Sequence, residues 1–287
     1  MFPADNVWNT PIDSLPVDPR SDAYVGTIGA GRTFHPDFGT VWQGAPNGIP
    51  YTLVPGDQPR VRVSFSYADE SDSGPYPIPA DAPIEGGPSS NGDRHVLLVD
   101  TGKCMLYELY AAYAQTDGSW KAGSGAIYDL NANKLRPSSW TSADAAGLPM
   151  LPGLVRFDEV DAGAINHALR FTAPLTQRAF VWPARHYASS NRDTSVPPMG
   201  ERFRLKADFD ISSYPPQIQV IFSALKTYGM MLADNGSPWY VSGAPDPRWD
   251  DDMLVRSFRS LHGSDFEAVD ASSLMVDPSS AAAAFPG

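Results

Sequence analysis

The sequence predicts a mainly β fold, an antiparallel β-sandwich or jelly-roll-like core with two or more helices added near the C-terminus. The 287 residues include 24 glycines and 28 prolines, and only 19% are charged, a balance typical of loop-rich β proteins. Short segments of alternating apolar and polar residues recur before the last third of the chain, where helical periodicity first becomes clear. We expect one β-rich domain over residues 1–278 and a flexible, Ser- and Ala-rich tail over residues 279–287.

The expected strands follow in chain order. Residues 60–67 alternate strictly between apolar and polar side chains, which is typical of a half-buried strand. A Pro-, Gly- and Ser-rich loop follows over residues 69–91, and loops of this length in compact domains are usually functional or disordered. Further strands are expected at 95–100, 104–114, 122–130, 179–187 and 202–209, with hairpin turns at Thr101-Gly102 and Asp117-Gly118. A β-hairpin is expected around Asp234-Asn235-Gly236, between residues 230–233 and 239–242.

Helical patterns are clearest late in the chain. Residues 214–228 carry an apolar stripe at helical spacing, and Gly229 stands just past the expected end. A second helix is expected to begin near Asp250, because the carboxylates there complement the positive N-terminal end of the helix dipole. Shorter helical turns are expected at 142–146 and 159–169.

Charge and composition exclude several classes of partner. The net charge of −12 and the pI near 4.7 disfavour nucleic acids and anionic membranes, because an acidic surface repels both. No apolar run approaches the roughly 18 residues needed to span a bilayer. Cys104 is the only cysteine, so an intrachain disulfide cannot form, and we expect it to be a buried small apolar residue in a strand.

Composition also predicts an extracellular location. Lysine is scarce, Trp, Tyr, Ser and Pro are abundant, and Met1 directly precedes FPADNVWNT without a leader, as in a mature secreted chain. Four runs resemble a group of secreted proteins from soil bacteria: DNVWNTPIDSLPVDPRS, WTSADAAGLPMLPGLVRFDEV, LKTYGMMLADNG and WYVSGAPDPRW. The resemblance covers nearly the whole chain. It implies secretion, and it carries no activity, ligand or catalytic residue.

Residues 140–187 concentrate aromatic, acidic, basic and imidazole side chains, the groups that a site for a polar ligand needs. No spacing among them matches a known catalytic signature. The candidate catalytic residues are Glu108, Glu159, His167, His186 and Tyr187. The candidate substrate-binding residues are Glu85, His95, Trp140, Asp144, Arg156, Arg185 and Trp182.

Two chemistries fit these residue types. Glycoside hydrolysis commonly uses two carboxyl groups, one protonated and one ionised. Glu108 lies between aromatic residues in LYELY, where a carboxyl group is costly to bury unless it meets a polar partner. A catalytic role and an ordinary salt bridge to Arg or Lys are equal alternatives for it. In a polysaccharide lyase, His186 and Tyr187 would act as base and acid while an arginine neutralises a uronate carboxylate. We expect Glu108, Glu159, His167 and His186 to line one cleft with Arg185 and a tryptophan.

The leading hypothesis is therefore a secreted carbohydrate-active enzyme, a glycoside hydrolase or a lyase, with a polysaccharide or oligosaccharide as its partner. One alternative is a non-catalytic carbohydrate-binding or cell-surface module with the same aromatic residues. The other is a metal-dependent enzyme that uses His95, His167 and His186. These histidines lack the close spacing of common metal motifs, so we expect no metal and no cofactor.

Overall fold

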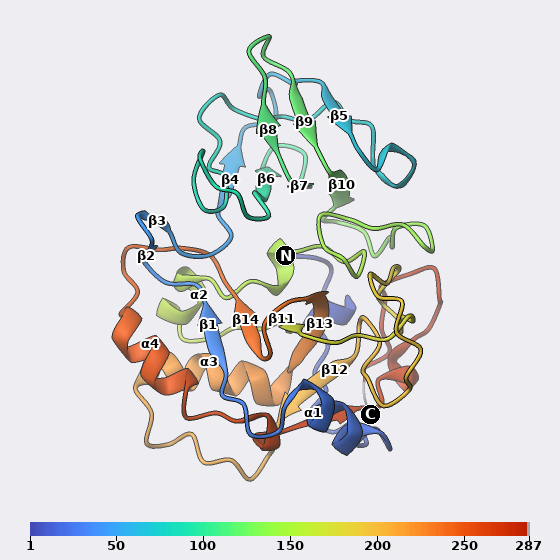
Figure 1. Cartoon of the computed structure of the whole chain (residues 1–287), viewed down its shortest axis with the longest axis vertical. Helices are drawn as coiled ribbons and strands as arrows, with labels where there is room; N and C mark the ends of the chain where they lie inside the picture. The colour runs from blue at the N-terminus through green and yellow to red at the C-terminus, as the bar shows by residue number, and fades with distance from the viewer. Residues whose placement is uncertain (286–287) are drawn as a thin grey trace.

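The strands of the computed structural model, which describes residues 1–285, form four sheets arranged in two lobes (Figure 1). Strand residues make up 26% and helical residues 17% of the chain, so strands outnumber helices as predicted. The largest sheet, however, is mixed, contains parallel pairs and is accompanied by helices. The architecture is therefore α/β and departs from an antiparallel sandwich.

The lower lobe contains the six-stranded sheet, in the order β1-β14-β11-β13-β12-β15. Its strands are β1 (His35–Asp37), β11 (Leu169–Ala173), β12 (Arg202–Leu205), β13 (Met230–Asn235), β14 (Tyr240–Ser242) and β15 (Phe266–Val269). The predicted hairpin at 230–242 is wrong, because β11 lies between β13 and β14 and pairs with both, parallel to β13 and antiparallel to β14. The strand β11 is nearly all buried. The helical turn predicted at 159–169 is wrong at its end, because Leu169 is the first residue of β11.

Four α-helices are described in this lobe: α1 (Ser21–Ile28), α2 (Phe157–Asp161), α3 (Pro216–Thr227) and α4 (Asp251–Phe258). The two late helices are confirmed. Helix α3 buries the stripe of Ile218, Ile221, Phe222 and Leu225, and Asp250 caps α4 by accepting a hydrogen bond from the Met253 N–H. Helix α1, which has eight residues like α4, was not predicted, because it is preceded by Arg20 and lacks the acidic N-cap that marks the start of α4. Short 3-10 helices occur at Val7–Asn9, Ala68–Glu70, Leu151–Gly153, Gly263–Asp265 and Ser272–Leu274.

The upper lobe consists of two smaller sheets (Figure 1). One has the order β10-β7-β6-β4 and comprises β4 (Tyr51–Val54), β6 (Val96–Asp100), β7 (Met105–Tyr110) and β10 (Ser124–Asp129). The other has the order β5-β9-β8 and comprises β5 (Val63–Phe65), β8 (Tyr113–Ala114) and β9 (Trp120–Ala122). A small hairpin of β2 (Val41–Trp42) and β3 (Ala45–Pro46) lies near the junction of the lobes. The predicted meander of β6, β7 and β10 is confirmed, although the strand expected at 104–114 is broken where Ala111 adopts a φ of 50°.

Several local predictions are wrong for identifiable reasons. Residues 142–146 form a hydrogen-bonded loop without a helix, and residues 179–187 form an irregular segment without a strand, in which Pro183 cannot donate a ladder hydrogen bond. Cys104 is exposed, because it occupies the turn before β7. Much of the expected flexible tail is packed: Ser280, Ala282 and Ala283 form isolated bridges with other segments. Residues 286–287 of that tail lie outside the described residues.

The hydrophobic core extends through both lobes. One large cluster surrounds the six-stranded sheet, and a second fills the upper lobe. A third joins Leu97 and Leu106 of the upper sheet to Met150, Leu151 and Leu154 below it, so apolar packing connects the lobes. Within residues 1–285, no helix is both long enough and apolar enough to cross a bilayer.

Candidate functional site

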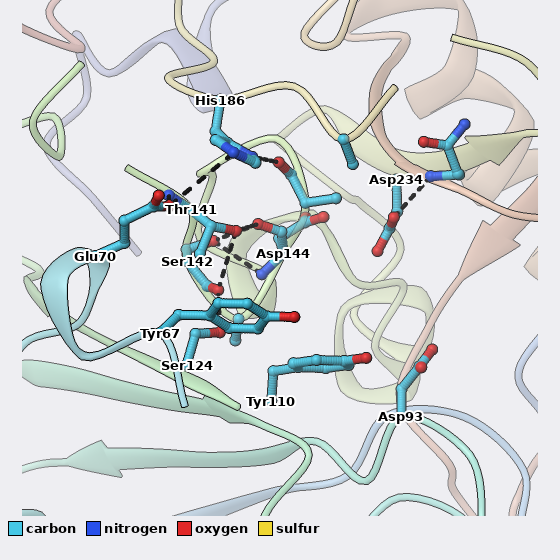
Figure 2. A pocket seen from close by; sticks show the side chains of 14 residues that line it. Tyr67, Glu70, Asp93, Tyr110, Ser124, Thr141, Ser142, Asp144, His186 and Asp234 are labelled. Atoms are coloured by element: carbon cyan, nitrogen blue, oxygen red, sulfur yellow. Dashed lines mark hydrogen bonds and ion pairs between the residues drawn. The ribbon is translucent and has the colours of Figure 1, made fainter. Parts of the chain in front are cut away.

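A cavity of about 380 Å³ opens between the two lobes (Figure 2). It lies where polar side chains gather at the ends of β7, β10 and β13 and on the loop over residues 141–145. The lining side chains that bear polar groups are Tyr67, Glu70, Asp93, Tyr110, Ser124, Thr141, Ser142, Asp144, His186, Asp234 and Asn235. Four of them are carboxyl groups. The cavity is therefore acidic and partly aromatic.

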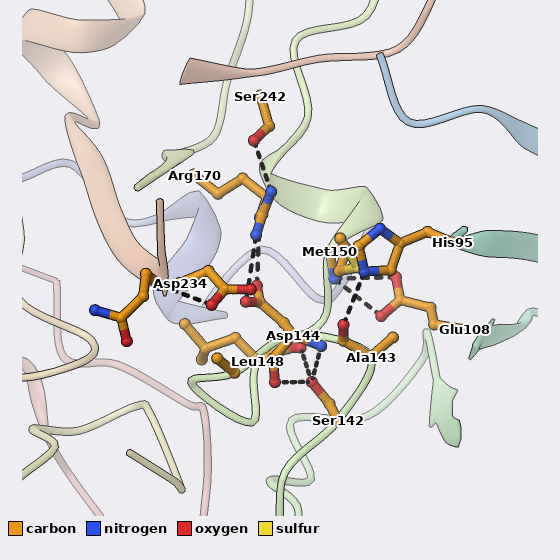
Figure 3. Close-up of polar contacts among 12 residues, drawn as sticks. His95, Glu108, Ser142, Ala143, Asp144, Leu148, Met150, Arg170, Asp234 and Ser242 are labelled. Atoms are coloured by element: carbon orange, nitrogen blue, oxygen red, sulfur yellow. Dashed lines mark hydrogen bonds and ion pairs between the residues drawn. The ribbon is translucent and has the colours of Figure 1, made fainter. Parts of the chain in front are cut away.

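Asp144 lines this cavity and is itself buried, and Figure 3 shows its polar contacts. Its two carboxylate oxygens accept hydrogen bonds of 3.3 Å from Nε and Nη2 of Arg170, a residue of β11. The Arg170 Nη1 donates to the Ser242 hydroxyl at 2.6 Å. The loop is held in place by Ser142, whose hydroxyl accepts from the Asp144 N–H and donates to the Leu148 carbonyl. A buried, bidentate ion pair of this kind is rigid, so Asp144 is fixed in position.

Asp234 lies at the end of β13 and also lines the cavity. Its carboxyl group accepts one hydrogen bond, 2.7 Å long, from the adjacent Asn235 N–H. Burial, followed by the nearby negative charge of Asp144, raises the pKa of Asp234 to about 7. A single guanidinium, that of Arg170, thus faces two carboxyl groups and neutralises only one of them. Asp234 therefore holds a proton at mildly acidic pH.

Glu70 and His186 lie on the side of the cavity opposite Asp234 (Figure 2). The His186 Nδ1 is 2.8 Å from the Ala145 carbonyl oxygen, so it carries a proton and donates it. The His186 Nε2 faces Oε2 of Glu70 at 4.0 Å. The same Glu70 oxygen accepts a hydrogen bond from the Thr141 N–H at 2.9 Å. The arrangement places a carboxylate and an imidazole directly across from the protonated Asp234.

Tyrosine rings form another wall of the cavity. Tyr67 and Tyr110 lie near each other below the polar groups in Figure 2, and the Tyr67 side chain is largely exposed. Flat aromatic faces next to polar groups are typical of sites that bind sugars, whose C–H faces pack against the rings. This wall could hold one sugar ring beneath the carboxyl groups.

Glu85 and His95 do not line the cavity, but His95 contacts the loop that does. The His95 Nδ1 is 2.6 Å from Oε2 of Glu85, and its Nε2 donates to the Ala143 carbonyl at 3.1 Å. Burial alone would lower the pKa of His95, but the charge of Glu85 and the hydrogen bond to it raise this pKa to about 9. The protonated His95 therefore anchors the loop that carries Asp144.

Glu108 lies deeper still and connects the two lobes. Its fully buried carboxyl group accepts hydrogen bonds of 2.9–3.0 Å from the N–H groups of Met150 and Leu151. Burial raises the pKa of Glu108 to about 7, although the two backbone donors oppose the shift. The costly burial was correctly recognised in the sequence. The partners, however, are backbone donors below the upper sheet, and Glu108 does not line the cavity.

Arg156, Glu159 and His167 form a separate cluster at α2. The Arg156 Nη2 is 2.5 Å from Oε1 of Glu159, and the His167 Nε2 is 3.1 Å from Oε2 of the same carboxylate. Burial tends to raise the pKa of Glu159, but the hydrogen bond from His167 and the charge of Arg156 hold it below its ordinary value. None of the three residues lines the cavity between the lobes.

The remaining candidates make structural contacts outside the cavity lining. The ring of Tyr187 stacks on that of His186, with 5.8 Å between centroids, while its hydroxyl accepts from Arg178. The Arg185 guanidinium donates to the Arg136 and Pro278 carbonyls. The Trp182 indole N–H donates to the Ser280 carbonyl, and the Trp140 ring lies 5.5 Å from the Arg136 guanidinium.

Of the candidate residues singled out from the sequence, the structure places two, Asp144 and His186, in the lining of the cavity between the lobes. The single cleft expected to unite Glu108, Glu159, His167 and His186 with Arg185 and a tryptophan does not form. Among the lining residues that were not predicted from the sequence are Tyr67, Glu70, Asp93, Tyr110 and Asp234. Of these, Asp234 had a usable signal, because an acidic residue directly after the buried run MMLA marks a strand end.

Metal binding and similarity to known proteins give no further guidance. No group of three or more His, Cys, Asp or Glu side chains within residues 1–285 is arranged to hold a metal ion. His95, His167 and His186 each bind different partners. Comparisons with protein-family models, curated proteins and solved structures found no match.

Proposed function

We propose that this protein is an extracellular glycoside hydrolase that cleaves a polysaccharide or oligosaccharide in the cavity between its lobes. The observation that carries the proposal is the pairing of a protonated carboxyl group, Asp234, with a carboxylate, Glu70, across an open cavity walled by tyrosine rings. Glycosidases place an acid and a carboxylate on either side of the bond to be broken.

The roles follow from the contacts. Asp234 donates its proton to the glycosidic oxygen as the bond to the sugar ring breaks. Glu70, positioned by the Thr141 N–H and facing His186, accepts a proton from the water that attacks the ring carbon. Asp144 is a positioning residue: burial, followed by the charge of Asp144 that Arg170 holds in place, keeps the proton on Asp234. The Tyr67 and Tyr110 rings hold the sugar.

The charge of the cavity favours particular substrates. Its lining contains four carboxyl groups, and His186 is the only basic side chain among the lining residues. Asp234 is protonated and Asp144 is paired with Arg170. The repulsion of a uronate therefore comes from Glu70 and Asp93, because like charges at short range disfavour binding. The arginines considered for a lyase, Arg156, Arg170 and Arg185, lie outside the lining, and Arg170 is paired with Asp144. Neutral or amine-bearing sugars therefore fit better than uronates, which favours hydrolysis over elimination.

A panel of polysaccharides tests the proposal. The purified protein is incubated with neutral glucans, xylan, chitosan, pectate and alginate, and both new reducing ends and ultraviolet absorbance are followed. We expect new reducing ends from a neutral or amine-bearing polymer without a rise in absorbance. A rise in absorbance on pectate or alginate indicates the lyase instead. Tight binding of a polymer without any cleavage indicates a non-catalytic carbohydrate-binding module.

A further inference from the structure

A second cavity, of about 260 Å³, lies at the other side of the lower lobe. It is formed where β12 begins and β15 ends, beside the segment that contains Trp182. Arg202 of β12 and Val269 of β15 pair directly at this point. None of its lining residues lines the cavity between the lobes, so the two cavities are separate.

Glu201 is the unusual residue of this second cavity. Its side chain lines the cavity, yet the residue is only 6% exposed. Its carboxyl group accepts one hydrogen bond, 3.2 Å long, from the Arg202 N–H, and no side chain within residues 1–285 forms a salt bridge with it. The Arg202 guanidinium points elsewhere, to the carbonyls of Val7 and Tyr228. A buried carboxyl group without a cationic partner is costly, which points to a partner that comes from outside the chain.

The rest of the lining matches an organic cation. Asp18 and Asp270 add two more carboxyl groups, and hydrogen bonds from Ser272 hold the pKa of Asp270 below its ordinary value. Arg202 also lines the cavity, but its guanidinium donates to the Val7 and Tyr228 carbonyls. Arg20, which is mostly exposed, lies 3.9 Å from Asp18. Apolar groups of Trp182 and Met275 complete the wall.

We propose that this cavity binds a primary ammonium group carried on an aromatic or alkyl body. The ammonium, with its three N–H donors, meets Glu201 and the neighbouring carboxylates. The body packs against Met275 and the Trp182 ring, whose orientation is fixed by the hydrogen bond from its indole N–H to the Ser280 carbonyl. A free small-molecule amine and the side chain of a lysine in a partner protein both carry a primary ammonium group on an apolar body. The inference does not depend on the hydrolase.

Proton release gives the binding a distinct signature. Burial, followed by the charge of Asp18, raises the pKa of Glu201 to about 8, so the empty site holds a proton at neutral pH. Arg20 opposes this shift and Asp270 adds to it, while Tyr24, whose pKa burial and Glu201 raise to about 12, stays neutral. A bound ammonium stabilises the carboxylate, so binding at neutral pH should release this proton.

Isothermal titration calorimetry of the full chain with benzylamine tests the site. We expect one benzylamine per chain, at least tenfold weaker binding of the uncharged benzyl alcohol, and release of a proton at neutral pH in buffers of different ionisation enthalpy. Glu201→Gln should weaken benzylamine binding at least tenfold. Asp57→Asn, a matched change at an exposed turn of the upper lobe, should leave it unchanged.

Nα-acetyl-lysine amide distinguishes the two sources of the amine. Tighter binding than benzylamine points to a lysine of a partner protein, and weaker binding points to a free amine. If Glu201→Gln does not fold, as judged by thermal unfolding, Asp270→Asn replaces it with the same expected loss. The proposal is overturned if benzylamine does not bind, if benzyl alcohol binds equally well, or if the folded variant binds benzylamine like the unchanged chain.

Discussion

Replacing Asp234 with Asn should stabilise the protein at alkaline pH and leave its stability nearly unchanged at acidic pH. The pKa of Asp234 is about 7 in the folded protein, against an ordinary value of 3.8. Because the folded state binds this proton more tightly, the free energy of unfolding falls as the pH rises from about 4 to about 7. The difference between these two pKa values corresponds to at most about 4 kcal/mol of stability, which is lost above neutral pH. Asn carries no charge and can still accept the hydrogen bond from the Asn235 N–H.

Urea unfolding followed by tryptophan fluorescence measures this effect across the pH range. The difference in unfolding free energy between Asp234→Asn and the unchanged chain should be near zero at about pH 4 and reach roughly 2–4 kcal/mol at about pH 8. Asp57→Asn, at an exposed turn, should show no such pH dependence. A difference that stays constant across the pH range would refute the reasoning, because it would mean that Asp234 titrates alike in the folded and unfolded chains.

Three further predictions follow from the same contacts. Asp144→Asn should lower the unfolding free energy by about 3–5 kcal/mol, measured by urea unfolding, because it breaks the buried bidentate ion pair with the Arg170 guanidinium; an unchanged midpoint would contradict the ion pair. Glu108→Ala should cost at least about 2 kcal/mol by the same assay, since two buried N–H donors lose their acceptor; a cost near zero would mean that water replaces the carboxyl group. Removal of metals with EDTA should leave the cleavage rate on the preferred polysaccharide unchanged, because residues 1–285 contain no converging group of metal ligands; loss of activity that zinc restores would contradict this.

Local patterns in the sequence predicted the parts of the fold that depend on neighbouring residues. The apolar stripe of α3 and the meander of β6, β7 and β10 are set by periodicity and short turns, and both were correctly predicted. The six-stranded sheet was not predicted, because the parallel pairing of β11 with β13 joins segments separated by a long crossover. Pairing of that kind leaves no mark in local periodicity. The motif ADNG therefore predicted a hairpin between β13 and β14, whereas β13 lies beside β11.

The candidate site, like the fold, was predicted only where residue type or neighbouring residues determine it. Residue types alone singled out Asp144 and His186, because carboxylates and imidazoles are the groups that catalysis needs. The cavity also requires Glu70 and Asp234, which the fold brings together from opposite lobes. The burial of Glu108 was anticipated from its apolar neighbours, but backbone N–H groups as its partners could not be. The sequence therefore indicates which polar residues are costly to bury better than it indicates which of them lie together in the fold.

The turnover number of Asp234→Asn tests the proposed hydrolase most directly. It is measured as reducing ends released at about pH 5 from the polysaccharide that the unchanged chain cleaves best, with Asp57→Asn as the matched control. Loss of a general acid lowers the rate by roughly 10²–10⁴-fold, so kcat should fall by at least about 100-fold while the fold remains intact. The control should retain full activity. An Asp234→Asn variant that cleaves the polysaccharide at the rate of the unchanged chain would contradict the account.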